Sequence, residues 1–237
     1  MFEGIRDQIN LLNSKQNNET TFIIIEGANN HFSSGNNLKN FMSSGINLQT
    51  ASKKEIFEVM HSNSVMLESF VNAFIDSDKP IITKVDGLCL GIMCTTQALC
   101  DYNYATKSAS FQTPFTKIAQ SPEGCSSYLF PQIFGQKLSR EILLENKKFD
   151  SQLALKYGFL SGVFENKIVM DEFVDRKLEN LGKLPQRSYL SSLKLIKEKD
   201  REILREVNKR ECKNLVERWT DFEELGPFLK AFFAPKN

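Results

Sequence analysis

The chain has 237 residues, of which 41% are hydrophobic and 25% are charged, and its formal net charge is +1. This is a globular composition, long enough to bury a sizeable core without disulfide or metal staples. The near-neutral charge gives no field that favours a nucleic-acid partner or an acidic membrane surface. The most basic stretch, residues 194–213, is partly neutralised by acidic residues within it: Glu198, Asp200, Glu202, Glu206 and Glu211.

Helix and strand signals alternate along the first part of the chain. Residues 4–16 carry apolar side chains at helical spacing and predict a short helix. "TFIIIEG" (21–27) is a β-branched run that ends in glycine, which indicates a buried strand. "ANNHFSSGNNL" (28–38) is rich in turn formers and predicts a loop, and residues 53–76 form an amphipathic helical pattern.

The same order recurs in the second part of the chain. "KPIITKVDG" (79–87) predicts a second strand between a proline and a glycine, and "LCLGIMCTTQALC" (88–100) a buried helix that begins just past Gly91. "DYNYATKSASFQTP" (101–114) is a third strand region. The remaining expected elements are short helices at 136–145 and 150–157, a strand at "GVFENK" (162–167), and helix from about 168 onward. This order indicates an α/β core followed by a helical region.

Two glycine turns follow predicted strands, in "SSGNNL" and in "DGLCLGIMC". A helix that starts just beyond such a turn presents N–H groups without a partner, and these carry partial positive charge. Two such turns side by side would aim two donors at one developing oxyanion. The alternative is that these glycines only end strands, as glycines do in many proteins.

The segment "SPEGCSSYLFP" (121–131) places Glu123 between a proline and a glycine. Glu123 is either a solvated turn residue, or a first-turn helix residue favoured by the helix dipole, or a carboxylate placed for chemistry. The small residues that follow it leave room beside the carboxylate.

Three separated segments resemble the enoyl-CoA hydratase/isomerase (crotonase) superfamily: "HFSSGNNL", "KPIITKVDGLCLGIMCTTQALCDYNYATKSASFQTPF" and "QSPEGCSSYLFPQIFG". Within it the chain looks most like the peroxisomal-type Δ3,Δ2-enoyl-CoA isomerases. The resemblance implies an α/β spiral of repeated ββα units at 1–165, and a helical region at 166–237 that covers the site and forms a homotrimer. It also implies an acyl-CoA thioester as ligand, with coenzyme A as part of the substrate and no separate cofactor or metal.

The resemblance also implies roles for individual residues. The two oxyanion donors fall on the backbone N–H groups of Asn36 and Ile92, and the catalytic carboxylate falls on Glu123. The substrate-binding positions implied are Ser34, Gly35, Asn36, Asn37, Leu38, Gly91 and Phe115.

The resemblance further implies which reaction is favoured. The two glutamates that activate water in the family's hydratases match Thr95 and Phe115 here, so hydration is expected to be disabled. An isomerase needs only one carboxylate, which moves a proton from C2 to C4. Against Phe115 and Ile92, the Glu123 carboxyl is expected to have a pKa raised by desolvation.

The chain departs from the family pattern at both ends. It begins at "MFEGIRDQINLL", already inside the family's first helix, so the family's first strand and the turn that helps to hold coenzyme A are not in it. No signal peptide, transit peptide or terminal peroxisomal tripeptide is recognised, and the five cysteines form no C-x-x-C pair. We expect an intracellular protein of the peroxisome or mitochondrion, by resemblance, without nucleic-acid or membrane partners.

Two functions remain open at the level of sequence. One is a Δ3,Δ2-enoyl-CoA isomerase of unsaturated fatty-acid β-oxidation. The other is a non-catalytic acyl-CoA or protein-binding domain of the chromodomain Y-like type, which shares the "QSP-x-GCS" segment. The glutamate after "QSP" favours the enzyme, and the first strand missing from the chain favours the binding domain.

Overall fold

The computed structural model describes residues 2–14, 17, 21–36, 51–221 and 223 of the chain. Its strands form two four-stranded sheets. The first sheet has the order β1 (Ile23–Glu26), β3 (Ile81–Val85), β5 (Tyr102–Thr106) and β8 (Gly162–Phe164), all parallel. The second sheet has the order β2 (His31–Ser33), β4 (Leu88–Leu90), β6 (Ser110–Gln112) and β7 (Phe149–Asp150), and its β6–β7 pair is antiparallel.

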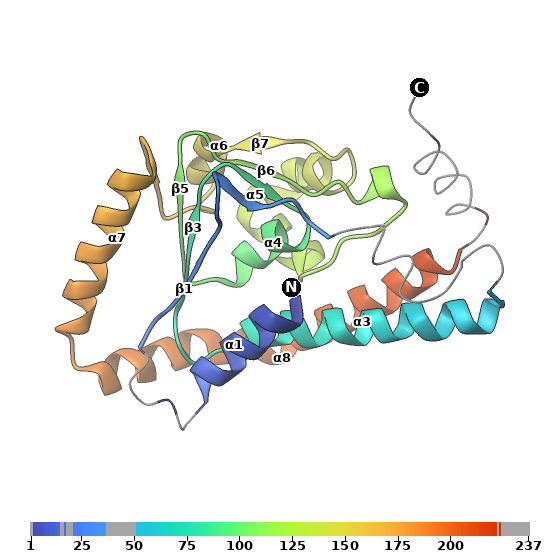
Figure 1. Cartoon of the computed structure of the whole chain (residues 1–237), viewed down its shortest axis with the longest axis horizontal. Coiled ribbons are helices and arrows are strands. Elements are labelled where there is room, and N and C mark those ends of the chain that lie inside the picture. Colours follow the sequence, from blue (N-terminus) through green and yellow to red (C-terminus); the bar gives the residue numbers. More distant parts are fainter. Residues whose placement is uncertain (1, 15–16, 18–20, 37–50, 222, 224–237) are drawn as a thin grey trace.

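The chain crosses from the first sheet to the second three times, from β1 to β2, from β3 to β4 and from β5 to β6 (Figure 1). The first two crossings pass through Gly27 and Gly87, where backbones approach too closely for a side chain. A Cβ on Gly27 would lie 2.1 Å from the carbonyl oxygen of His31, and one on Gly87 would lie 1.9 Å from that of Asn30. The predicted α/β spiral of repeated ββα units is confirmed.

Three helices pack together beside this spiral: α1 (Phe2–Asn13), α3 (Lys53–Ile75) and α8 (Gln186–Trp219). Figure 1 shows α3 and α8 side by side, with α1 along α3. Ser52 begins α3 with a capping box, in which its hydroxyl accepts the N–H of Glu55 and the Glu55 carboxylate accepts the N–H of Ser52. The buried Asn208 of α8 donates to the Glu68 carbonyl and the Asn72 side chain of α3, so a polar contact fixes the two helices together.

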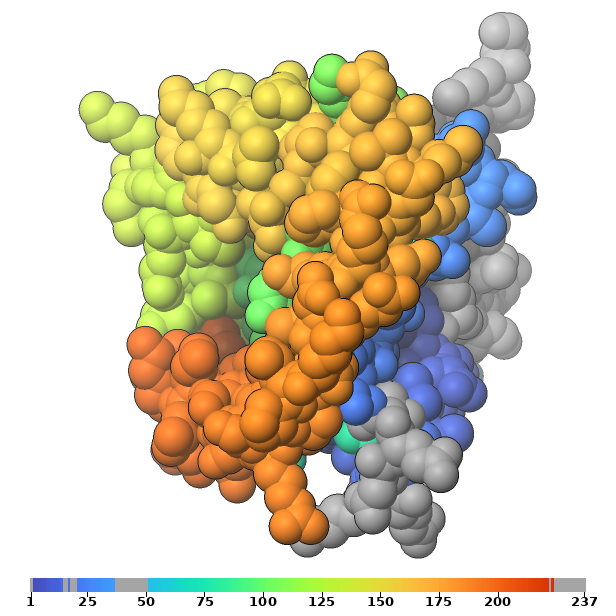
Figure 2. All heavy atoms as spheres, turned by 90° about the vertical axis from the view of Figure 1, so that its left-hand side faces the viewer, coloured from blue at the N-terminus to red at the C-terminus, as the bar shows by residue number. Residues whose placement is uncertain are grey.

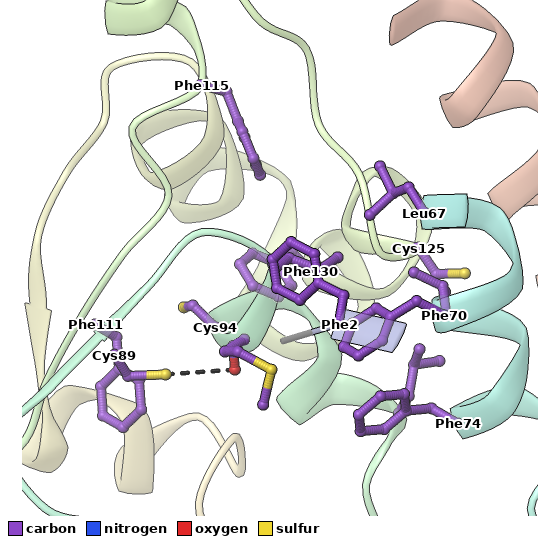
Figure 3. Close-up of a cluster of buried hydrophobic side chains, with 14 of the residues drawn as sticks. Phe2, Leu67, Phe70, Phe74, Cys89, Cys94, Phe111, Phe115, Cys125 and Phe130 are labelled. Atoms are coloured by element: carbon purple, nitrogen blue, oxygen red, sulfur yellow. Dashed lines mark hydrogen bonds between the residues drawn. The ribbon is translucent and has the colours of Figure 1, made fainter. Parts of the chain in front are cut away.

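The core lies between these helices and the second sheet. Figure 3 shows Phe70 and Phe74 pointing inward from α3, near Phe2 of α1, while Phe111 and Cys89 come from the sheet strands. Since such aromatic side chains each bury a large apolar area, this cluster is a main source of the stability of the fold.

A second, smaller apolar cluster holds α7 (Lys167–Gly182) over the first sheet. It consists of Ile82 and Tyr104 from the strands and Met170 and Val174 from the helix. Figure 2 shows α7 running obliquely across this side of the molecule. The helices α7 and α8 supply the helical pattern expected after residue 168.

The remaining helical elements are α4 (Ile92–Thr95), the 3-10 helices Thr96–Leu99 and Thr116–Ile118, α5 (Ser126–Leu143) and α6 (Ser151–Lys156). The helix expected at 136–145 is the second half of α5, which begins at Ser126 and kinks at Gly135. In the described part of the chain, no helix is long and apolar enough to cross a membrane.

Two short strands were not predicted from the sequence. Residues 31–33 were expected in a loop, and no strand was expected at 88–90, ahead of the helix predicted to begin just past Gly91. Both segments are strands, β2 and β4. Strands of three residues carry too little periodicity to be recognised. They are extended because each one pairs with its neighbours in the second sheet.

Candidate active site

An apolar hollow of about 140 Å³ opens where the second sheet meets α1, α3 and the end of α8. A space of this size accepts a molecule about as large as benzene. The residues that line it are Phe2, Ser34, Gly35, Asn36, Met66, Leu67, Leu90, Gly91, Ile92, Pro114, Phe115, Ile118, Gln120, Glu123, Leu215 and Trp219. Glu123 is the one ionisable side chain among these lining residues.

The two glycine turns meet at one edge of the second sheet. The parallel strands β2 and β4 are neighbours, so the turns that follow their carboxyl ends lie together. Gly35 (φ +82°) and Gly91 (φ +60°) both have left-handed backbones that favour glycine. A Cβ on Gly91 would lie 3.8 Å from the Gly35 Cα, so the two turns lie close together.

The second turn is held firmly in place. The N–H of Gly91 donates to the Gln112 carbonyl of β6 (3.0 Å), and the Gly91 carbonyl accepts the N–H groups of Cys94 and Thr95. Ile92 is the first residue of α4, and by that position its N–H has no partner within the helix. Both Ile92 and Asn36, the residue after Gly35, line the hollow.

Glu123 approaches the hollow from the loop before α5 and is only 5% exposed. Its Oε1 accepts a hydrogen bond from the Thr95 hydroxyl (3.3 Å). Its Oε2 is buried and has no hydrogen-bond partner among the described residues. Gly124 makes this approach possible, because it has φ +66° and a Cβ there would lie 2.3 Å from Thr95 Oγ1.

The surroundings of Glu123 disfavour its charged form. Burial raises the pKa of its carboxyl well above the usual range, and the nearby charge of Glu211 acts in the same direction. The hydrogen bond from Thr95 opposes these effects. The expectation of a raised pKa is therefore met, with Glu211 as an additional cause that the sequence did not indicate.

The structure brings together most of the residues singled out from the sequence. Asn37 and Leu38 lie outside the described residues. The other positions all line the hollow: Ser34, Gly35, Asn36, Gly91, Ile92, Phe115 and Glu123. Sequence reasoning missed the apolar wall, which comes from Phe2 of α1, Met66 and Leu67 of α3, and Leu215 and Trp219 of α8. Helical apolar residues of this kind look like ordinary core, so no sequence signal marked them.

The two positions matched to the water-activating glutamates hold no acid. Thr95 is completely buried and its hydroxyl donates to the Ile92 carbonyl (3.0 Å), besides its contact with Glu123. Phe115 is 2% exposed and also lines the hollow. No cluster of His, Cys, Asp or Glu in the described residues has the arrangement of a metal site.

Comparison with known proteins agrees with this geometry. Residues 4–217 match the family model described as "Enoyl-CoA hydratase/isomerase". The chain is 36% identical over 228 residues to enoyl-CoA delta isomerase 2 of Rattus norvegicus, covering 96% of this chain and 56% of that protein. It is 32% identical over 235 residues to the peroxisomal enoyl-CoA delta isomerase 3 of Mus musculus, covering 99% of this chain and 71% of the relative.

A relative of a different kind is chromodomain Y-like protein of Homo sapiens, 34% identical over 164 residues, which cover 69% of this chain and 27% of that protein. Among solved structures, an enoyl-CoA hydratase/isomerase described as putative, from Acinetobacter baumannii, superposes with a TM-score of 0.82 at 25% identity, over 98% of this chain and 87% of the other. The chain spans about half the length of the first curated relative that it matches.

Proposed function

Since the chain belongs to the enoyl-CoA hydratase/isomerase family, we propose that it is a Δ3,Δ2-enoyl-CoA isomerase, which moves a double bond of an acyl-CoA thioester from C3 to C2. The observation that carries this proposal is the buried Glu123 carboxylate. It lines an apolar hollow together with both glycine turns, and its Oε2 is left without a partner among the described residues.

The proposed reaction uses Glu123 first as a base and then as an acid. Oε2 removes a proton from C2, and the electrons move into the thioester carbonyl to give a dienolate. The backbone N–H groups of Asn36 and Ile92 stabilise the enolate oxygen. Glu123 then returns the proton to C4, which leaves the double bond between C2 and C3. A raised pKa suits a group that must both accept and donate a proton near neutral pH.

The remaining parts of the proposal follow the family. The ligand is an acyl-CoA thioester, whose acyl chain lies against the apolar wall that includes Leu67, Leu215 and Trp219. The helical region after residue 165 forms a homotrimer, and the reaction serves the β-oxidation of unsaturated fatty acids. One relative is described as peroxisomal, which favours the peroxisome as the compartment.

The direct test is a spectrophotometric assay with a 3-enoyl-CoA. An isomerase accumulates the conjugated 2-enoyl thioester, and its absorbance reports the rate. Light scattering of the same preparation measures the mass and tests the trimer. Binding of the thioester without turnover would instead support the second candidate, a non-catalytic acyl-CoA-binding domain, which the match to chromodomain Y-like protein favours.

We expect hydration of a 2-enoyl-CoA to be negligible beside isomerisation. Adding water requires groups that deprotonate the water and protonate carbon, and Thr95 and Phe115 supply neither. The measurement is the loss of 2-enoyl absorbance, run beside the 3-enoyl assay on one enzyme sample. Hydration at a rate comparable to isomerisation would contradict the assignment of these two positions.

A further inference from the structure

We propose that Glu211 of α8 is a positioning residue for Glu123. Its carboxylate holds the strained turn that follows Glu123, and it adds a negative charge near the Glu123 carboxyl group. The inference rests on the proposed isomerase function and deepens it. It assigns a role to a buried acidic residue that lies outside the lining of the hollow.

The turn after Glu123 needs external support. Gly124 (φ +66°) and Cys125 (φ +62°) are consecutive residues in the left-handed region. Glycine adopts this conformation freely, but a residue with a Cβ does so at a cost, and it persists only where its surroundings enforce it. Cys125 is also the N-cap residue of α5, and its side chain makes no capping hydrogen bond to the helix.

Glu211 supplies the missing cap from a distant part of the chain. Its Oε2 accepts the N–H of Cys125 (2.7 Å) and its Oε1 accepts the N–H of Ser127 (2.9 Å). The first N–H groups of a helix have no partner inside it, and a buried carboxylate binds them strongly because the hydrogen bonds are charge-assisted. Glu211 is only 6% exposed, so water competes little for these bonds.

The two contacts also indicate the charge state of Glu211. The pKa of this carboxyl is raised, because burial outweighs the hydrogen bonds from Ser127 and Cys125, which lower it. Both oxygens accept backbone N–H groups, and these contacts favour the carboxylate form of Glu211. Its charge opposes ionisation of Glu123, whose protonated form is thereby favoured.

Other groups around the two carboxylates do not supply this negative charge. Thr95 faces Glu123 from α4 through a neutral hydroxyl. Burial raises the pKa of the Cys125 and Cys212 thiols, so both are neutral near pH 7. Arg210 precedes Glu211 on α8 and favours its carboxylate form.

The decisive variant is Glu211→Gln, with Glu206→Gln, an exposed position of the same helix, as the matched control. We expect kcat for a 3-enoyl-CoA to fall about tenfold or more, with KM changed by less than about threefold, because geometry at the base is lost while the pocket remains. The rising limb of the pH profile of kcat/KM should move to lower pH, because removing a negative neighbour lowers the pKa of Glu123.

A second readout needs no turnover. Carbon-13 NMR of the glutamate carboxyls, with the Glu123 signal assigned by its absence in Glu123→Gln, measures the protonation midpoint of Glu123. This midpoint should fall in Glu211→Gln and stay unchanged in Glu206→Gln. If Glu211→Gln does not fold, Glu211→Asp replaces it: the charge remains, so kcat should fall while the midpoint stays within about half a unit of the original.

The outcomes separate this inference from the proposed function. Wild-type protein without isomerase activity would refute the proposed function, and the NMR midpoint would still decide the coupling of the two carboxylates. A fall in kcat with an unmoved midpoint in Glu211→Gln would overturn the inference, since any structural damage produces that result. Wild-type kcat in either Glu211 variant would overturn it as well.

Discussion

Glu123→Gln is expected to lower isomerase turnover by about two to four powers of ten, the usual contribution of general acid–base catalysis. Glutamine keeps the shape of the side chain and can still accept the hydrogen bond from Thr95. It cannot take a proton from C2 or return one to C4. Binding of a non-reacting acyl-CoA should be largely retained, because the apolar wall and the glycine turns are unchanged.

Turnover and calorimetric binding measured on the same preparation test this expectation. Glu145→Gln, an exposed position beyond the site, is the matched control and should behave like the wild type. Glu123→Asp should also be impaired, since the shorter side chain withdraws the carboxylate from C4. Unchanged turnover in Glu123→Gln would assign the proton transfer to another group. A joint loss of binding and folding would make Glu123 a structural turn residue.

Ile92→Pro is expected to lower turnover by about two to three powers of ten, the typical cost of losing one oxyanion donor. Proline has no N–H, so the substitution removes the proposed donor itself. Ile92 is the first residue of α4, where proline is well tolerated because that N–H makes no helical hydrogen bond. The substitution should therefore raise the energy of the transition state and leave the stability of the fold largely unchanged.

Two controls isolate the main-chain group. Ile92→Val keeps the N–H and trims the apolar side chain, and Asn36→Ala keeps the other proposed donor while removing an exposed side chain. Both should retain turnover within about an order of magnitude of the wild type. Thermal unfolding of all three variants shows whether the fold survives. Full turnover in a folded Ile92→Pro protein would contradict the role of this N–H.

The sequence located an element correctly where the pattern of neighbouring residues alone determines that element. Apolar runs ending in glycine located β1 and β3, and helical spacing located α1 and α3 within a few residues. The motif containing Glu123 pointed to the right loop, because the consecutive residues proline, glutamate and glycine can be recognised without knowing what packs against them. The three-residue strands β2 and β4 escaped recognition, although the glycine turns that they carry were singled out.

Glu211 illustrates what a local pattern cannot supply. In the sequence it is one of five acids that partly balance the basic stretch 194–213. In the structure it is buried, and it binds two backbone N–H groups at the start of α5, more than eighty residues away. The pattern of a charged helix face does not distinguish a solvated glutamate from one that caps a distant helix, because the difference lies in what packs against it.

By itself, the sequence determined the order of the main strands and helices, the two glycine turns and the presence of one carboxylate in a tight loop. These properties depend on the backbone preferences and spacing of neighbouring residues. Only the tertiary structure decided that the two turns lie close together, that Glu123 is buried beside Thr95 with one oxygen lacking a partner among the described residues, and that the charge of Glu211 acts on it. These properties depend on burial and on charges brought together across the chain, which set the protonation of a carboxyl group and therefore its chemistry.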